Sequence, residues 1–130
     1  MKKLLFLAIL LLTLINFYGQ LNVGDIAIIG MNTDAEDSFS FITLRDIPGS
    51  EKIYFTDRGV KNSTTWNVAI EGTTLFTAPV AGIPIGTIIR IEETAADVLT
   101  ITGVTGATIS IVQGSFNLAG GDQNVSISTR

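Results

Sequence analysis

The residue types that could support catalysis are few in this chain, because it contains no Cys and no His. Without them there is no thiol nucleophile, no disulfide, no Ser-His-Asp relay and no His- or Cys-ligated metal. Carboxylates, hydroxyls and a single tryptophan, Trp66, remain. The chemistry open to the chain is therefore cation binding through oxygen, acid–base work by carboxylates, or recognition by contact alone.

The densest group of carboxylates is Asp34, Glu36 and Asp37, which share one polar loop, and Asp57 follows a later apolar run. Calcium needs six to eight oxygen ligands at about 2.3–2.6 Å, and clustered loop carboxylates supply such ligands. The spacing does not match an EF-hand loop. Two interpretations stay open: a calcium site formed by these four residues, or a solvated acidic turn that keeps a sheet edge soluble.

Trp66 stands among small polar residues, with Asn62 before it and Asn67 directly after it. An exposed indole ring can stack on a sugar while amides bond the hydroxyl groups of the ligand. A single tryptophan can equally cap the core of a β-domain. The sequence thus offers Trp66, Asn62 and Asn67 as candidate ligand-binding residues, beside the alternative that Trp66 is a core residue.

An enzyme is disfavoured by the positions of the other candidate groups. Glu92, Glu93 and Asp97 could suggest a glycosidase, which needs two carboxylates about 5–9 Å apart. Adjacent residues of a strand point to opposite faces, however, so Glu92 and Glu93 do not form a pair. A Ser or Thr nucleophile would need a base, and only a carboxylate or a lysine such as Lys52 or Lys61 could serve. We expect no enzyme.

The first twenty residues resemble an export signal. Lys2 and Lys3 precede an apolar run, and Gly19 and Gln20 offer a cleavage point. An apolar helix of about twelve residues covers roughly 18 Å, short of the ~30 Å hydrocarbon core. Residues 1–20 are therefore predicted to be a helical signal peptide with no stable membrane span after cleavage, and an uncleaved anchor is the alternative.

The rest of the chain, residues 21–130, has the length and composition of one acidic domain. The net charge of −4 becomes −6 without the two leader lysines, and 46% of all residues are hydrophobic. A basic surface for nucleic acid is absent. This domain is expected to be secreted or to lie at the outer cell surface. Its end at Arg130 leaves two alternatives, a strand edge of the domain or the front of a longer protein.

Short runs with period two, separated by Gly, Pro and Asp, predict strands and almost no helix. Thr is frequent beside Ile, Val and Phe, which also favours strands. The expected strands are 24–31, 38–44, 52–57, 72–77, 86–92, 98–104, 107–112, 115–118 and 124–128. The first is apolar on both faces and is predicted to be central. A hairpin is predicted around Thr105-Gly106, and Val60–Glu71 is predicted to be a long loop.

This spacing is typical of an all-β antiparallel β-sandwich of jelly-roll or Ig-like type with about eight short strands. Together with the leader, the sequence predicts a signal helix followed by one sandwich domain.

Several motifs resemble a domain of exported proteins from environmental bacteria. They are Gly24-Asp25-Ile26-Ala27, Gly30-x-Asn32-x-Asp34, Phe39-x-Phe41, Ile53-x-Phe55-Thr56-Asp57-x-Gly59, Thr77-Ala78-Pro79-x-x-Gly82-Ile83-x-x-Gly86-Thr87 and Gly121-Asp122-Gln123. The resemblance covers nearly all of residues 23–123. It implies a front module of larger surface or secreted proteins and brings no catalytic residues. Members tend to continue beyond the last motif, so the chain is expected to be C-terminally incomplete.

The sequence therefore predicts a secreted or cell-surface, non-enzymatic binding or structural module without a cofactor. Its expected partners are an extracellular ligand or surface glycan and other modules of a larger protein. The competing hypothesis is a calcium-assisted carbohydrate-binding or adhesion domain.

Overall fold

The computed structural model describes residues 21–33, 36–56, 60–62, 65–66, 72–116, 118 and 126–129. Within these ranges the chain forms ten β-strands and no helix, so the all-β prediction is confirmed. Nothing in the same ranges forms a helix long and apolar enough to cross a membrane. The predicted signal helix, residues 1–20, lies outside the described residues.

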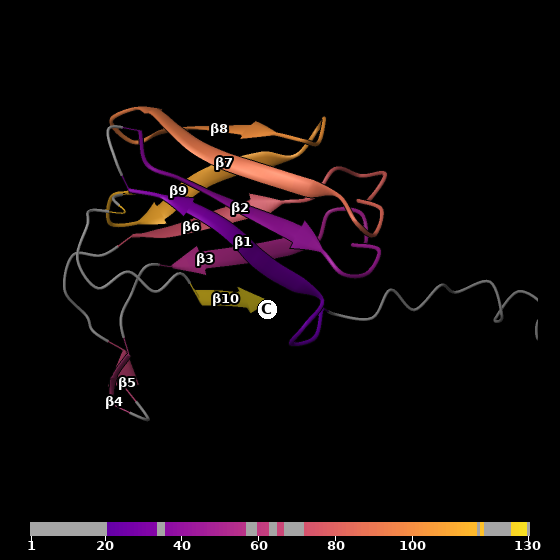
Figure 1. Ribbon diagram of the computed structural model, residues 1–130, viewed down its shortest axis with the longest axis horizontal. Coiled ribbons are helices and arrows are strands. Elements are labelled where there is room, and N and C mark those ends of the chain that lie inside the picture. Colours follow the sequence, from indigo (N-terminus) through magenta and orange to yellow (C-terminus); the bar gives the residue numbers. More distant parts are fainter. Residues whose placement is uncertain are drawn as a thin grey trace, which may run out of the picture.

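Eight of the strands form two antiparallel sheets of four strands each (Figure 1). Sheet I contains, in spatial order, β1 (Ile26–Asn32), β2 (Ser38–Thr43), β7 (Ile88–Ala95) and β8 (Val98–Thr102). Sheet II contains β10 (Ser126–Thr129), β3 (Lys52–Thr56), β6 (Thr73–Thr77) and β9 (Thr108–Gln113). A small hairpin of β4 (Val60–Asn62) and β5 (Thr65–Trp66) projects away from both sheets in Figure 1.

The alternation in β2 shows why the two sheets pack face to face. Phe39 and Phe41 point inward and are at most 1% exposed, and Ser40 between them faces outward. Phe55 and Phe76 of sheet II point toward them and are also buried. The ring centroids of Phe39 and Phe55 lie 4.8 Å apart, and Phe41 meets Phe76 edge to face at 5.6 Å. Tilted and edge-to-face arrangements at these distances are the favoured ones.

The aromatic cluster lies at the centre of a continuous core. Aliphatic residues from both sheets and from the loops complete it, and each buried side chain of this size contributes about 1.5–3 kcal/mol of transfer free energy. Its buried members are Leu21, Phe39, Phe41, Ile47, Ile53, Phe55, Phe76, Ala78, Ile83, Ile89, Ile91, Phe116 and Leu118. The two sheets and this core form a β-sandwich-like fold.

Three connections cross between the sheets at one end of the molecule. Loop 44–51 joins β2 to β3, loop 78–87 joins β6 to β7, and residues 103–107 join β8 to β9. We call loops 44–51 and 78–87 the arches, and this end the arch end. At the opposite end lie the β1–β2 and β7–β8 turns and the buried residues Phe116 and Leu118. We call Phe116 and Leu118 the strap, and that end the strap end.

The prediction that the first strand is central is wrong. Among the described strands, β1 lies at the edge of sheet I, where it pairs with β2 alone. Ile26 and Ile28 pack against the core, whereas Ile29 is 50% and Met31 40% exposed. A register shift between Ile28 and Gly30 marks a bulge, which changes the side of the sheet that the following residues face. Apolar residues on both faces therefore did not mean burial on both faces.

The predicted hairpin around Thr105-Gly106 is also wrong. β8 pairs with β7 around the two-residue turn Ala96-Asp97, and β9 pairs with β6 in the other sheet. Residues 103–107 carry the chain from one sheet to the other. Gly103 makes this crossing at φ +94, and a Cβ there would lie 2.1 Å from the carbonyl oxygen of Ile88. The glycine serves a close approach between backbones rather than a hairpin turn.

Two further expectations need correction. The segment 60–71, predicted as a loop, contains the short strands β4 and β5. Residues 115–118, predicted as a strand, form no strand among their described members; Phe116 and Leu118 are buried there instead, at 7% and 2% exposure. Apolar residues that close the end of a core have the same composition as a short strand, which explains the error.

Candidate functional site

Two of the three candidate sugar-binding residues, Asn62 and Trp66, lie on the β4–β5 hairpin. Asn62 ends β4 and Trp66 ends β5, and the antiparallel register pairs Val60 with Trp66. The structure thus brings Asn62 and Trp66 onto one two-stranded element. Asn67 lies outside the described residues.

Two of the four candidate calcium ligands, Asp34 and Asp57, also lie outside the described residues. Of the other two, Glu36 is exposed, and its backbone carbonyl accepts a hydrogen bond from the Asn32 side chain at 3.1 Å. Asp37 has a different role, since its Oδ2 accepts a hydrogen bond from the backbone N–H of Leu118 at 2.6 Å. That carboxylate holds the strap in place.

Two more carboxylates at the strap end also accept hydrogen bonds from the backbone. Glu93 donates its N–H to the carbonyl of Asp37 at 2.8 Å, and its Oε1 accepts from the N–H of Asp97 at 2.6 Å. Oδ1 of Asp97 accepts from the N–H of Phe116 at 3.3 Å. The side chains of Asp37 and Asp97 thus bind the two strap residues. Across the described ranges, no three Asp or Glu side chains are grouped so that they could hold a metal ion.

The arch end is organised around the buried hydroxyl of Thr43, which is 0% exposed. Its Oγ1 donates to the carbonyl of Pro84 at 2.8 Å and accepts from the N–H of Thr87 at 3.0 Å. The hydroxyl of Thr87 donates to the same carbonyl at 2.7 Å. Both lone pairs of the Pro84 oxygen are therefore used, and the second arch is fixed to the end of β2.

The two arches are also joined to each other through the backbone. Ile47 and Ile83 exchange N–H···O bonds of 2.8 and 2.9 Å as an isolated antiparallel bridge. Gly82 adopts φ +77, and a Cβ there would lie 2.6 Å from the carbonyl oxygen of Ile47. Close approach of backbones at this point requires glycine. The arches consequently form one preformed surface.

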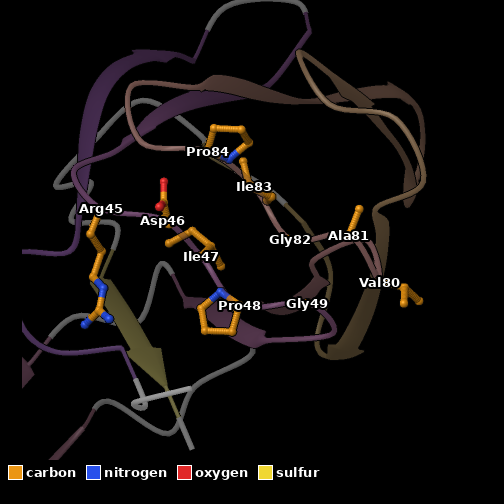
Figure 2. A pocket seen from close by; sticks show the side chains of 10 residues that line it. All are labelled: Arg45, Asp46, Ile47, Pro48, Gly49, Val80, Ala81, Gly82, Ile83 and Pro84. Atoms are coloured by element: carbon orange, nitrogen blue, oxygen red, sulfur yellow. The ribbon is translucent and has the colours of Figure 1, made fainter. Parts of the chain in front are cut away.

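A groove of ≈ 540 Å³ lies between the arches (Figure 2). Buried Ile47 and Ile83 lie at its base, whereas Val80, 88% exposed, points away from it in Figure 2. The residues that line it are Arg45, Asp46, Ile47, Pro48, Gly49, Val80, Ala81, Gly82, Ile83 and Pro84. Its volume exceeds that of a depression beside Met31, ≈ 300 Å³, and that of a small cavity beside Thr74, ≈ 10 Å³.

The side chains that line the groove are mostly apolar. Its charged members are Arg45 and Asp46. Arg45 lies 3.3 Å from the carboxylate of Asp25, and Oδ1 of Asp46 accepts from the N–H of Ile85 at 2.8 Å. No hydroxyl, amine or second carboxylate lines the groove to complete a nucleophile–base or acid–base pair. What it offers a ligand is apolar contact, backbone polar groups and two charges of opposite sign.

The groove was not among the predicted sites. Its signal in the sequence is the repetition of Pro and Gly in two loops, Pro48-Gly49 and Pro79 to Pro84. Each loop alone indicates a turn. Only the bridge between Ile47 and Ile83 shows that the two loops form one surface.

Comparison with known protein families, with curated proteins and with solved structures finds no match for this chain.

Proposed function

We propose that this chain is an exported, non-enzymatic binding module that acts outside the cell or at its surface and contacts its ligand through the groove between the arches. The observation that carries this proposal is the preformed groove of ≈ 540 Å³ with its bridged backbone. Loops fixed on a rigid β-scaffold are frequent binding sites, because the scaffold removes the entropic cost of ordering them.

The basic and apolar leader, residues 1–20, supports export. The topology supports a more specific type of sandwich. Three connections between the sheets are compatible with a jelly-roll or Ig-like sandwich. The motif resemblance favours a module of a larger surface or secreted protein. The proposals of export, of sandwich type and of a larger parent protein do not depend on which ligand is bound.

Binding of the secreted protein to a glycan array and to a random peptide library tests the groove. Ala81→Trp places a large ring in the groove, and Val98→Trp is the matched control, because Val98 is 52% exposed at the strap end. We expect Ala81→Trp to weaken binding by about tenfold or more and Val98→Trp to leave it unchanged. Equal binding by Ala81→Trp and wild type would contradict the proposed site, and turnover of a substrate would contradict a non-enzymatic role.

The calcium-assisted carbohydrate or adhesion domain remains the second proposal. It is weaker because Oδ2 of Asp37, one of its four ligands, already accepts the N–H of Leu118. An ion that binds only the folded protein raises the melting temperature by mass action. A rise of several degrees at millimolar Ca²⁺ relative to EDTA, without the same rise in Mg²⁺, would favour this second proposal over the first.

A further inference from the structure

The hydroxyl of Thr74 lies buried in the core near the strap. The residue lies on β6, is 2% exposed, and pairs with Phe55 of β3 so that its side chain enters the core. Among the described residues its Oγ1 has no hydrogen-bond partner. Buried hydroxyls are nearly always paired, with protein or with ordered water, because an unpaired one costs its full desolvation free energy.

A small cavity lies beside this hydroxyl, and its size restricts what it can hold. Its volume is ≈ 10 Å³, and Thr74, Gly72, Phe39 and the two strap residues are among those that line it. One water molecule needs about 10–15 Å³ by this measure, whereas a small aromatic ligand such as benzene occupies an engineered cavity of about 150 Å³. The volume therefore excludes an organic ligand and admits a single water.

A buried water also needs at least two polar partners. The first is Thr74 Oγ1. The second is the carbonyl oxygen of buried Gly72, which accepts one hydrogen bond from Thr56 Oγ1 at 2.9 Å and has a second lone pair. Gly72 and Thr74 line the same cavity.

We propose that one water molecule is built into the core at the strap end, bound between Thr74 Oγ1 and the carbonyl oxygen of Gly72. Phe116 and Leu118, both buried, line the cavity that contains it.

The chain contains a matched control for this site. Thr43 is also buried and faces the core, but its Oγ1 bonds to protein groups at Pro84 and Thr87. Replacing Thr43 by Val removes both of these hydrogen bonds to protein groups, so the Thr87 N–H loses the Thr43 hydroxyl as an acceptor. Replacing Thr74 by Val removes only the bonds to the proposed water.

The test combines oxygen-17 relaxation dispersion of water with thermal melts of the full protein. We expect Thr74→Val to remove the signal of one long-lived water, with a melting temperature equal to or below that of wild type. Thr43→Val should keep that signal and melt several degrees lower. A Thr74→Val variant that melts several degrees higher would overturn the proposal, because the wild-type hydroxyl would then be unpaired.

A crystal structure of the wild-type protein provides a readout that does not depend on any variant folding. Density for one water within hydrogen-bond distance of Thr74 Oγ1 would support the proposal. A Thr74 hydroxyl bonded to protein, or a cavity without density, would overturn it. Neither result bears on the groove between the arches.

Discussion

The arch end and the strap end close the same core by different means. At the arch end, the backbones of Ile47 and Ile83 hydrogen-bond to each other. The hydroxyl of Thr43 donates one hydrogen bond and accepts another within the protein. At the strap end, the carboxylates of Asp37 and Asp97 hold two buried apolar residues from outside the sheets.

This difference assigns different roles to polar residues that look alike in the sequence. Asp37 and Asp97 at the strap end accept the partly buried N–H groups of Leu118 and Phe116, which would otherwise lack an acceptor, so these two carboxylates stabilise the fold. The arch end is fixed by backbone bonds and by the hydroxyls of Thr43 and Thr87, which leaves the exposed apolar residues of the groove, such as Ala81, available to a ligand. The comparison predicts that removing a carboxylate costs more stability at the strap end than at the arch end, where stability depends on Thr43 and on close backbone contact, and that substitutions of exposed groove residues act mainly on binding.

The largest expected effect comes from the strap itself. Phe116→Ala removes a ring that is 7% exposed and lies 6.0 Å from the ring of Phe39. We expect the free energy of unfolding in urea to fall by about 3–5 kcal/mol. Phe116→Leu retains most of the apolar volume and should cost less than about 1.5 kcal/mol. Equal, small losses for both variants would show that the strap is not part of the core.

At the arch end the sensitive positions are glycines. Gly82→Ala combines φ +77 with a Cβ 2.6 Å from the carbonyl oxygen of Ile47, and should lower the free energy of unfolding by about 2–3 kcal/mol. Gly86→Ala is the control, because Gly86 has a similar φ of +81 but open space around its Cβ position. It should cost about 1 kcal/mol. If both variants lose the same stability in urea, the arches are not in close backbone contact.

The carboxylates of the two ends can be compared directly. Asp37→Ala leaves the partly buried N–H of Leu118 without its acceptor, and should cost about 2 kcal/mol in urea unfolding. Asp46→Ala exposes the N–H of Ile85 to water at an exposed site, and should cost about 0.5 kcal/mol or less. A larger loss for Asp46→Ala would reverse the assignment of structural carboxylates to the strap end.

The fold was predictable where the signal is local. Alternation of Phe and Ser in residues 38–41 indicates a strand with one buried face; the structure confirms the strand and the burial of Phe39 and Phe41, although Ser38 on the other face is also buried. The partner of β8 was not predictable, because a glycine such as Gly103 suits a hairpin turn as well as a crossing between sheets. Local pattern determines the strands, whereas their pairing depends on contacts distant in sequence.

The same limit applies to the candidate site. The sequence shows that Asp37 is a carboxylate in a polar loop, but its partner Leu118 lies 81 residues later in the chain. The groove likewise depends on two loops that meet only in the fold, at Ile47 and Ile83. Residue type indicates which chemistry is available, and only tertiary structure shows whether a group is already used.

The smallest effect is expected for the ion pairs. Arg45 lies 3.3 Å from Asp25 and links the arch end to the residues before β1, whereas Arg90 lies 2.8 Å from Glu92 on its own strand. Arg45 and Arg90 are 41% and 45% exposed, so water and salt screen both pairs.

Arg45→Met should therefore lower the free energy of unfolding by about 1 kcal/mol or less, and Arg90→Met by less still, because its pair joins residues two apart on one strand. Urea unfolding at low and at high NaCl separates charge from packing. Added salt should shrink the loss caused by Arg45→Met if the ion pair is responsible. A loss that is unchanged by salt would mean that the apolar stem of Arg45 stabilises the arch end by contact.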